Sequence, residues 1–586
     1  MTNRVALEFE EETPALTRSL WKEFFGLSRW TRNGERPEWN KLQTARTRPR
    51  WWTGVGGVIV VTLFIQAMMV TWVWDHHLIY AIGDSVSHMT IARRVWDSPN
   101  PGLSQLGTTW LPLPHLFFII PSLWLWAWRT GLGGSFVTVG CAVVTSVSMF
   151  RIGQRTGVGN VGGWVGAMIV ATNPSWSYVS AVPLTEPFTV ATTCLATAGV
   201  LRWAQAERPY SAGMTALFCG LPTAAAMLTR YEAWGFAALI GLAFLRVSWQ
   251  RYGWSSALRT QVLAFAGLPA LAVVWWLIFN WSVFGNPLAF ENGPYSSKVL
   301  VAPLRSLGLL YGAGSIPGSI ALYGKTLLDV AGSATALAAL AGLAVTIIKW
   351  RKMKNELWLC LAGSGVLVMI SIWQGQIEIR LPGMIPIGVV NTRYGVESLP
   401  FLAVAATQLL RLVPSAPTFS NGRILRQATG LALVVVLSGG WFIGVATGSQ
   451  PNNALTVLEA KDSAKSYANQ QAVGRWLHSY AAKGYILFDD SVLKIAPTVG
   501  FDLHRVIMTS SGATWKRLLA HPLDASWLAV QVGNRSDIVW RTMQKAKVLD
   551  TAFLPVAAFG SFVIYERESQ VTHFSASTLL PLSTSG

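Results

Sequence analysis

The sequence predicts an α-helical polytopic membrane protein with about eleven spans, followed by a small extracytoplasmic α/β domain. Hydrophobic residues make up 52% of the 586 residues and charged residues only 13%, whereas about a quarter of an ordinary soluble protein is charged. The 29 tryptophans suit a protein with long membrane–water interfaces. Apolar stretches long enough to cross a bilayer recur until residue 450, where polar residues return.

The net charge of +18 does not indicate nucleic-acid binding. Much of the basic excess lies in short loops between apolar stretches, as the positive-inside rule expects of cytoplasmic loops. The four cysteines each lie inside an apolar stretch, and no pair has metal-ligand spacing, so we interpret them as small buried residues. They are Cys141, Cys194, Cys219 and Cys360.

The pattern divides the chain into four parts. Residues 1–50 are expected to form a cytoplasmic basic tail, which is too long for the charged region of a cleaved signal peptide. Residues 51–450 are expected to form a transmembrane module in a cell membrane of bacterial type, with an outer loop over residues 75–132. Residues 451–570 are expected to form the extracytoplasmic domain, and residues 571–586 a disordered tail.

The apolar stretch at 111–128 is not counted among the crossings. It contains Pro112, Pro114 and Pro121, and prolines remove backbone donors and bend helices. A crossing there would also place the next basic cluster, Arg151 and Arg155, outside the cell. We therefore expect this stretch to lie at the outer side. The predicted crossings are 51–74, 134–150, 158–174, 188–205, 211–229, 232–250, 261–282, 328–349, 357–374, 396–412 and 427–447.

Between two of these crossings, residues 283–327 are rich in Gly and Pro and are predicted to form an outer loop with a partial helix near 305–324. In the C-terminal domain, the pattern predicts one helix and three short strands. The helix covers Gln470–Lys483, and the strands cover Tyr485–Phe488, Trp527–Gln531 and Ser561–Tyr565.

Asp84 and His88 stand out in the outer loop that follows the first span. They are four residues apart, so on a helix they share one face. A carboxylate beside apolar spans is costly unless the protein uses it. We interpret the segment as the core of a catalytic loop; a solvated loop with an incidental acid is the alternative.

Further polar residues fall on the same outer face in the predicted topology. Acids and arginines there have a structural alternative as well, because buried ion pairs also satisfy interfacial charge. Glu291, Glu378 and Arg380 fit solvated loop charge better than function. The stronger candidates are Glu186, Arg230, Glu232, Arg393 and Tyr394.

Chemistry at an outward face has no access to nucleotide sugars or ATP, but it can reach substrates carried by lipids. The chain also has no Walker loop, nucleophile elbow or His-Glu-x-x-His motif. Transfer of a sugar from a lipid phosphate needs a carboxylate to accept a proton and positive charge near the departing phosphate. Asp84 is a candidate for the first role, and Arg230 and Arg393 for the second.

Several short motifs resemble those of C-type membrane glycosyltransferases, especially the dolichyl-phosphate-mannose protein mannosyltransferase-like group and the bacterial aminoarabinose transferase. The resemblance covers roughly residues 50–450. The motifs are Asp84 to Arg93, Trp110-Leu111-Pro112-Leu113-Pro114, Leu184-Thr185-Glu186-Pro187, Thr229-Arg230-Tyr231-Glu232-Ala233-Trp234 and Asn391-Thr392-Arg393-Tyr394-Gly395.

The resemblance implies an inverting hexosyl- or pentosyltransferase with a polyprenyl-phosphate-linked sugar donor and an outward site. Asp84 would be the general base and Glu186 a second acid in the site. The acceptor would be a protein, a lipid or a glycan. The residues expected to bind substrate are His88, Arg230, Glu232, Arg393 and Tyr394.

Two departures from the family pattern bear on metal binding. Ser85 follows Asp84 where the protein mannosyltransferases have an Asp-Glu pair, and no Glu stands at Trp110-Leu111, where the aminoarabinose transferase has a metal-binding one. Whether a divalent cation takes part therefore stays open. Two other functions also stay open: a transporter or flippase of a lipid-linked saccharide, and a scaffold whose C-terminal domain binds cell-wall glycan.

Overall fold

The computed structural model describes residues 53–107, 109–293, 296–350, 353–413, 420–447 and 454–568. The predicted basic tail at 1–50 and the predicted disordered tail at 571–586 lie outside the described residues. The chain divides into two compact units, Met1–Val61 and Thr62–Gly586, and helix α3 (Val55–Asp75) crosses the boundary between them. Every contact described below lies within the second unit.

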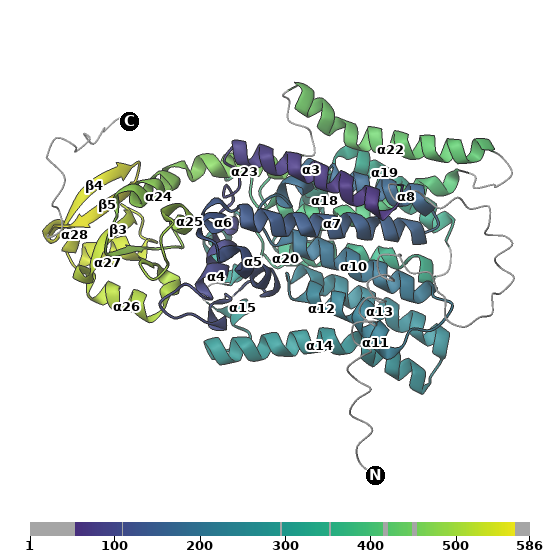
Figure 1. The fold of residues 1–586 in the computed structure, drawn as a ribbon, viewed down its shortest axis with the longest axis horizontal. Helices are drawn as coiled ribbons and strands as arrows, with labels where there is room; N and C mark the ends of the chain where they lie inside the picture. The colour runs from purple at the N-terminus through teal and green to yellow at the C-terminus, as the bar shows by residue number, and fades with distance from the viewer. Residues whose placement is uncertain are drawn as a thin grey trace, which may run out of the picture. The chain divides into compact units, whose positions relative to one another are not determined.

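Each predicted crossing corresponds to helical structure, and most form one continuous helix (Figure 1). The predicted 211–229 span is instead built from α11 (Ala212–Thr215), a π-helical turn η3 (Ala216–Gly220) and α12 (Leu221–Met227). The other helices are α7 (Leu132–Arg155), α8 (Gly159–Ala171), α9 (Pro174–Val179), α10 (Glu186–Gln205), α13 (Glu232–Tyr252), α14 (Ser256–Phe284), α19 (Ser333–Ile348), η5 (Leu357–Leu361), α20 (Ala362–Trp373), η6 (Thr392–Ser398), α21 (Leu399–Thr407), η7 (Gln408–Leu412) and α22 (Ser420–Thr447).

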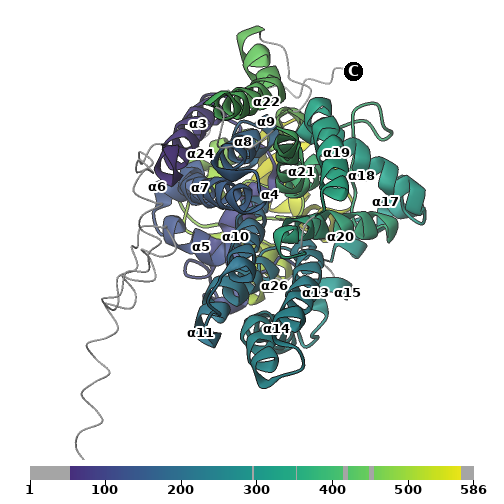
Figure 2. The ribbon, with the colours of Figure 1, turned by 90° about the vertical axis from the view of Figure 1, so that its right-hand side faces the viewer.

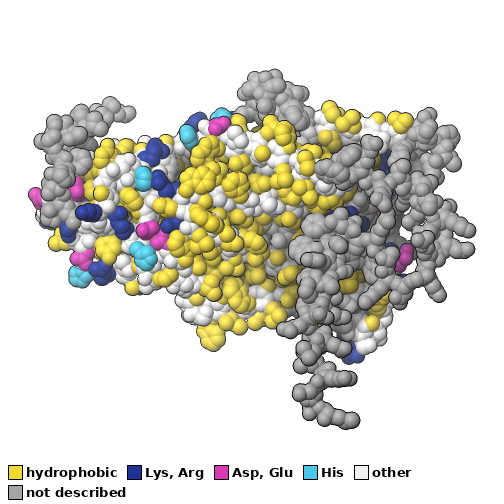
Figure 3. Space-filling model, in the orientation of Figure 1, with side chains coloured by type: hydrophobic (Ala, Val, Ile, Leu, Met, Phe, Trp, Pro, Cys, Tyr) yellow, Lys and Arg dark blue, Asp and Glu magenta, His cyan; other side chains and the backbone are white. Residues whose placement is uncertain are grey.

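Among the described residues, three helices are long and apolar enough to cross a membrane: α3, α7 and α14. Helices α18 (Ile316–Ala331) and α19 reach that length only together, and they meet at 112°. Hydrophobic side chains cover most of the visible face of the helical part, whereas charged side chains gather over the C-terminal domain (Figure 3). These features fit an integral membrane protein, while the number of eleven crossings and the side on which each loop lies stay predictions.

Glycines allow the central helices to approach closely, which is typical of helix packing in membranes. A Cβ atom on Gly235 of α13 would lie 2.4 Å from the carbonyl oxygen of Gly363 in α20. Likewise, a Cβ atom on Gly153 of α7 would lie 2.5 Å from the Cα atom of Gly163 in α8. Figure 2 shows α7, α8, α10 and α21 near the centre of the helical part. This core holds the segments that carry the candidate site.

The stretches that were predicted to lie on the outer side are made of short elements. The 111–128 stretch forms α5 (Leu113–Ser122) and most of α6 (Leu125–Thr130). Ten helical residues rise about 15 Å, which is half of a bilayer core, so α5 cannot cross alone. The partial helix predicted near 305–324 is wrong in its bounds, because the long helix of this region, α18, starts at Ile316 and runs to Ala331. Short turns precede it: α15 (Ala289–Asn292), α16 (Ser297–Leu300) and α17 (Ala302–Ser306).

The C-terminal domain is an α/β domain around one five-stranded sheet in the order β2-β1-β3-β5-β4. The three predicted strands match β1 (Tyr485–Phe488), β3 (Ala525–Gln531) and β5 (Phe562–Arg567). The sequence interpretation missed β2 and β4. Strand β2 (Val506–Ile507) has only two residues, and edge strand β4 (Phe553–Phe559) contains Pro555 next to a register shift.

The helices of this domain begin with α23 (Leu455–Ser466) and α24 (Ala468–Tyr480). Helix α24 packs on the sheet, and the domain shares its core with the loop that was predicted to be on the outer side. Phe488 and Val473 of the domain belong to the same buried cluster as Met89, Phe118 and Trp128. The remaining helices are α25 (Ala496–Val499), α26 (Ala513–Ala520), α27 (Ile538–Lys545) and α28 (Val548–Thr551).

Candidate active site

Three of the predicted site acids lie in the first turns of three helices. Asp84 lies in the first turn of α4 (Gly83–Arg94), Glu186 begins α10, and Glu232 begins α13. A carboxylate is favourable there because the helix dipole is positive at the N-terminus. The proline that follows Glu186 is also well placed at the start of a helix.

The two predicted arginines lie in the connections between helices. Arg230 lies in the turn between α12 and α13, and Arg393 lies in η6. The backbone before Arg393 turns at Asn391, which has a positive φ of 57°. The Asn391 side chain donates a 2.8 Å hydrogen bond to the backbone oxygen of Glu378, which helps to hold this unusual conformation.

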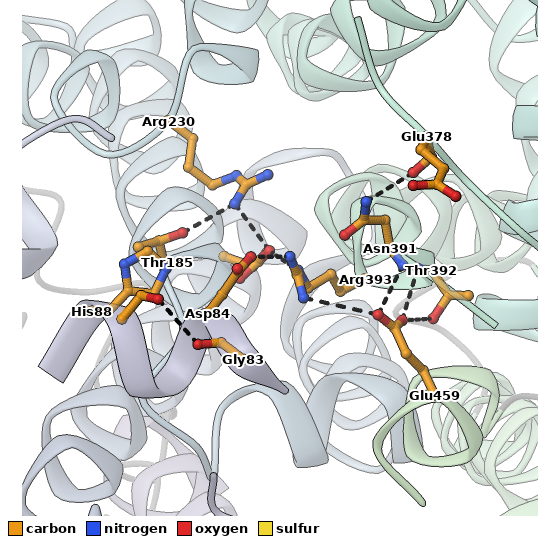
Figure 4. Close-up of polar contacts among 12 residues, drawn as sticks. Gly83, Asp84, His88, Thr185, Arg230, Glu378, Asn391, Thr392, Arg393 and Glu459 are labelled. Atoms are coloured by element: carbon orange, nitrogen blue, oxygen red, sulfur yellow. Dashed lines mark hydrogen bonds and ion pairs between the residues drawn. The ribbon is translucent and has the colours of Figure 1, made fainter. Parts of the chain in front are cut away.

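Arg393 joins three acids that are far apart along the chain (Figure 4). It forms an ion pair with Asp84 and a 2.8 Å contact with Glu186, and its Nη1 lies 3.9 Å from Glu459. Its side chain is almost completely buried, whereas 34% of the Asp84 side chain is exposed. Asp84 therefore lies at the accessible side of a buried charge cluster.

Arg230 forms the second half of the same cluster. Its Nη1 donates 3.0 Å hydrogen bonds to Thr185 Oγ1 and Glu186 Oε1. Its Nε lies 3.3 Å from Glu232 and 2.9 Å from Glu397. Because Glu186 Oε1 contacts both arginines, this carboxylate connects the two halves.

Two predicted substrate-binding residues, Tyr394 and His88, lie next to this network. The ring of Tyr394 lies 4.8 Å from the Arg230 guanidinium carbon, in a cation–π contact. His88 lies on the same helix as Asp84, and its Nδ1 is 3.0 Å from Nε2 of His115. Burial lowers the pKa of His88 to about 4, although Asp84 and Glu186 act in the opposite direction. His88 is therefore neutral at pH 7.

The structure thus brings all seven predicted site residues into one region, and it adds residues that sequence reasoning missed. Glu397 lies two residues beyond the motif that contains Arg393, and as an acid at the start of an apolar stretch it could have been found from the sequence. Glu459 is buried and accepts hydrogen bonds from the backbone nitrogens of Asn391 and Thr392, at 2.8 and 2.9 Å. Its position in the C-terminal segment gave no signal.

The acids predicted to be solvated lie outside this network. Glu378 pairs with Arg380 at 2.6 Å, and Glu291 accepts a 3.1 Å hydrogen bond from Gln376. Among the described residues, no ion pair joins them to the two arginines of the cluster. They lie apart from the cluster as expected, but Glu378 and Arg380 form a mostly buried pair and are not solvated charges.

The electrostatics of the cluster favour an ionised carboxylate at its accessible edge. Burial raises the pKa of Asp84, but the Arg393 guanidinium and other nearby charges more than offset this, so the pKa lies below its usual value. Glu186 is fully buried, and its Oε2 has no hydrogen-bond partner among the described residues. Within that part of the chain, no group of three or more His, Cys, Asp or Glu residues is arranged to hold a metal ion.

The fold is that of the C-type membrane glycosyltransferases, as the sequence motifs predicted. ArnT from Cupriavidus metallidurans, solved bound to undecaprenyl phosphate, matches with a TM-score of 0.53 and 13% sequence identity, over 89% of this chain and 99% of ArnT. At this identity the match shows the shared fold alone.

Two further solved structures are similar at lower scores. The arabinofuranosyltransferase AftD from mycobacteria matches with a TM-score of 0.46 and 12% identity, over 89% of this chain and 40% of AftD. The oligosaccharyltransferase of Archaeoglobus fulgidus, solved with Zn and sulfate, matches with a TM-score of 0.43 and 11% identity, over 80% of this chain and 67% of that protein. No family model and no curated protein matches the sequence.

Proposed function

We propose that this protein is an inverting membrane glycosyltransferase that transfers a hexosyl or pentosyl group from a polyprenyl-phosphate carrier to an extracytoplasmic acceptor. The acceptor is a hydroxyl group of a protein, a lipid or a glycan. The fold class supports the general reaction, and the ArnT structure with undecaprenyl phosphate makes a polyprenyl phosphate the first carrier to test.

One observation carries the proposal. Asp84, Glu186, Arg230 and Arg393 are separated by up to 309 residues along the chain, yet their side chains form one network of ion pairs. Buried ionisable groups near apolar helices are costly to retain. The exposed fraction of Asp84 leaves one edge of this network open to a substrate.

In the proposed reaction, Asp84 accepts the proton of the acceptor hydroxyl while that oxygen attacks the anomeric carbon of the donor. The new bond forms as the bond between the anomeric carbon and the phosphate oxygen breaks. The electron pair leaves with the polyprenyl phosphate, whose negative charge increases by one. Attack from the face opposite the phosphate inverts the anomeric configuration.

The remaining residues support this step. Glu186 holds both arginines in position, and Arg230 and Arg393 place positive charge near the departing phosphate. Neutral His88, with Glu232 and Tyr394, is expected to help orient the substrate. The positive charge of Arg393 also keeps Asp84 ionised, so that it can accept a proton at neutral pH.

The proposal is tested with the full-length protein in lipid nanodiscs and a panel of hexosyl and pentosyl polyprenyl phosphates. Released polyprenyl phosphate and glycosylated acceptor are measured together, because transport without transfer produces neither. Asp84→Asn is expected to reduce the rate by about 10³-fold or more. Asp75→Asn is the matched control, because Asp75 is an exposed acid at the end of α3. Normal transfer by Asp84→Asn would contradict the mechanism.

A further inference from the structure

The contacts of the active-site cluster raise the question of which positive group compensates the phosphate of a bound donor. Two arginines contact five carboxyl groups, so the positive charge of each guanidinium group is already shared among several acids. A phosphate that enters such a site adds further negative charge, and like charges in a buried site repel strongly. The five carboxylates are those of Asp84, Glu186, Glu232, Glu397 and Glu459.

Both arginines are already partly compensated by carboxylates, so an additional cation would strengthen the binding of a phosphate. Arg230 contacts three carboxylates and the ring of Tyr394, while Arg393 contacts three carboxylates, of which Glu186 is shared with Arg230. Their guanidinium groups would have to give up these contacts before they could bind a phosphate directly. A cation without a carboxylate partner is better suited to that task.

Lys494 of the C-terminal domain is such a cation, and it lies at the start of the Asp84 helix. A Cβ atom on Gly83, the residue before Asp84, would lie 3.5 Å from Cγ of Lys494 and 2.9 Å from Oη of Tyr467. Among the described residues, no acid lies within ion-pair distance of the Lys494 ammonium group. Its charge also helps to lower the pKa of Asp84, behind the larger effect of Arg393.

The backbone of Lys494 is fixed by helix α24. The Lys494 nitrogen donates a 2.9 Å hydrogen bond to Gln470, and its oxygen accepts a 3.2 Å hydrogen bond from Gln471. Its two neighbours in the chain, Leu493 and Ile495, are fully buried in the core of the domain. The backbone of Lys494 is therefore anchored and its Cγ lies against Gly83, while the flexible side chain carries the ammonium group.

We propose that Lys494 binds the phosphate group of the polyprenyl-linked donor, so that the C-terminal domain supplies a substrate-binding residue of the active site. This inference rests on the proposed function. An ammonium group is a compact charge with three donors, suited to phosphate oxygens in several orientations. The departing phosphate becomes more negative during transfer, so Lys494 stabilises the transition state more than the bound donor.

The test measures binding and transfer separately in the full-length protein. Undecaprenyl phosphate, without any sugar, is titrated into nanodiscs that contain wild type, Lys494→Met, Lys494→Arg or Lys483→Met. Lys483 is an exposed lysine of the same domain, so its variant controls for the loss of one positive charge. Inorganic phosphate is titrated in parallel, to separate recognition of the lipid-linked group from recognition of free phosphate.

Loss of one charged hydrogen bond predicts that Lys494→Met weakens undecaprenyl phosphate binding about tenfold or more. Lys494→Arg is expected to remain within about threefold of wild type, because it keeps the charge. With a sugar-carrying donor, Lys494→Met should lower kcat as well as raise KM. The inference would be overturned if Lys494→Met, Lys483→Met and wild type all bound undecaprenyl phosphate with the same affinity.

The two proposals fail in different ways. If wild type binds undecaprenyl phosphate in a Lys494-dependent manner but transfers no sugar from any donor, the proposed function fails and the phosphate site stands. If wild type transfers sugar and Lys494→Met is equally active, the phosphate site fails and the function stands. Equal weakening of binding by Lys483→Met would mean that only the overall charge of the domain matters, and would also overturn the inference.

Discussion

Helix α4 has a buried arginine at each end, and the two have different surroundings. Arg393 meets the first turn of the helix at Asp84, while Arg93 lies in its last turn. The exposed fractions of the two residues are 5% and 2%, so both charges are equally removed from water. Their difference is therefore one of partners and not of burial.

Arg93 has the surroundings of a structural residue. Its guanidinium carbon lies 4.7 Å from the ring centre of Trp96 and 4.6 Å from that of Trp128. Its Nε pairs with Asp97 at 2.7 Å, and Asp97 accepts a 3.1 Å hydrogen bond from the backbone of Leu503. This end of α4 therefore attaches the C-terminal domain to the helical part, through the buried Arg93–Asp97 pair and a 3.6 Å contact of Arg93 with the exposed Asp502.

The Asp84 end has an excess of acids instead. Arg393 shares Glu186 with Arg230, and Oε2 of both Glu186 and Glu397 is buried without a hydrogen-bond partner among the described residues. The comparison indicates that the Arg93–Asp97 pair holds two parts of the protein together, whereas the shared acids of the Asp84 end fit the chemistry that we propose for it.

Exchanging arginine for lysine at both ends tests this comparison, and the largest effect is expected at the Asp84 end. Arg393→Lys keeps the charge but loses the planar group that contacts Asp84 and Glu186 together. A small displacement of a catalytic group can reduce the rate about 100-fold, so kcat should fall by that order while the melting temperature changes little. Steady-state transfer and thermal unfolding in nanodiscs measure the two quantities. A large loss of stability with normal kcat would contradict the difference in roles.

Arg93→Lys should show the reverse pattern. The lysine cannot stack between the two tryptophans while it also contacts Asp97, and the loss of one charged hydrogen bond costs about 2 kcal/mol. The free energy of unfolding should fall by that amount, while kcat per folded molecule stays near the wild-type value. A loss of kcat in the fully folded variant would mean that this end of α4 also serves catalysis.

The fold could be predicted largely because membrane helices carry a strong local signal. Apolar stretches of sufficient length and three strands of alternating pattern located most elements. Where prediction failed, the decisive feature was tertiary: Gly332 separates α18 from α19 at a sharp bend, and two-residue β2 exists only because β1 lies beside it.

The candidate site shows the same division between local and tertiary information. Asp84, Glu186 and Arg230 stand out because they are charged residues next to apolar spans. Glu459 lies in a polar segment and resembles any surface acid until the fold brings it to the backbone of Thr392. Lys494 is equally inconspicuous in the sequence, because only the packing of the C-terminal domain places it against Gly83. Residues contributed by a second domain could not be found from the motifs of the first.

The smallest effect is expected from His88→Gln, which removes a buried histidine of α4 and changes how stability depends on pH. Burial lowers its pKa to about 4, so the folded protein keeps it neutral where the unfolded chain, with an ordinary histidine pKa near 6.5, takes up a proton. Stability is therefore lost as pH falls from 6.5 towards 4, and the His88 contribution at pH 5.5 amounts to about 1 kcal/mol. The free energy of unfolding of wild type and of His88→Gln is measured between about pH 7.5 and pH 5. The titration of Asp84 and the other carboxylates is common to both proteins and cancels in the difference.

As the pH falls below 6.5, the free energy of unfolding should decrease more for wild type than for His88→Gln, because the variant has no imidazole to protonate. The pH profiles of transfer activity of wild type and His88→Gln should have the same shape near pH 6.5, since His88 is already neutral throughout this range. An inflection near 6.5 that disappears in the variant would mean that His88 titrates normally in the folded protein. In that case His88 faces water, and the Asp84 end of α4 is more open than its buried contact with His115 implies.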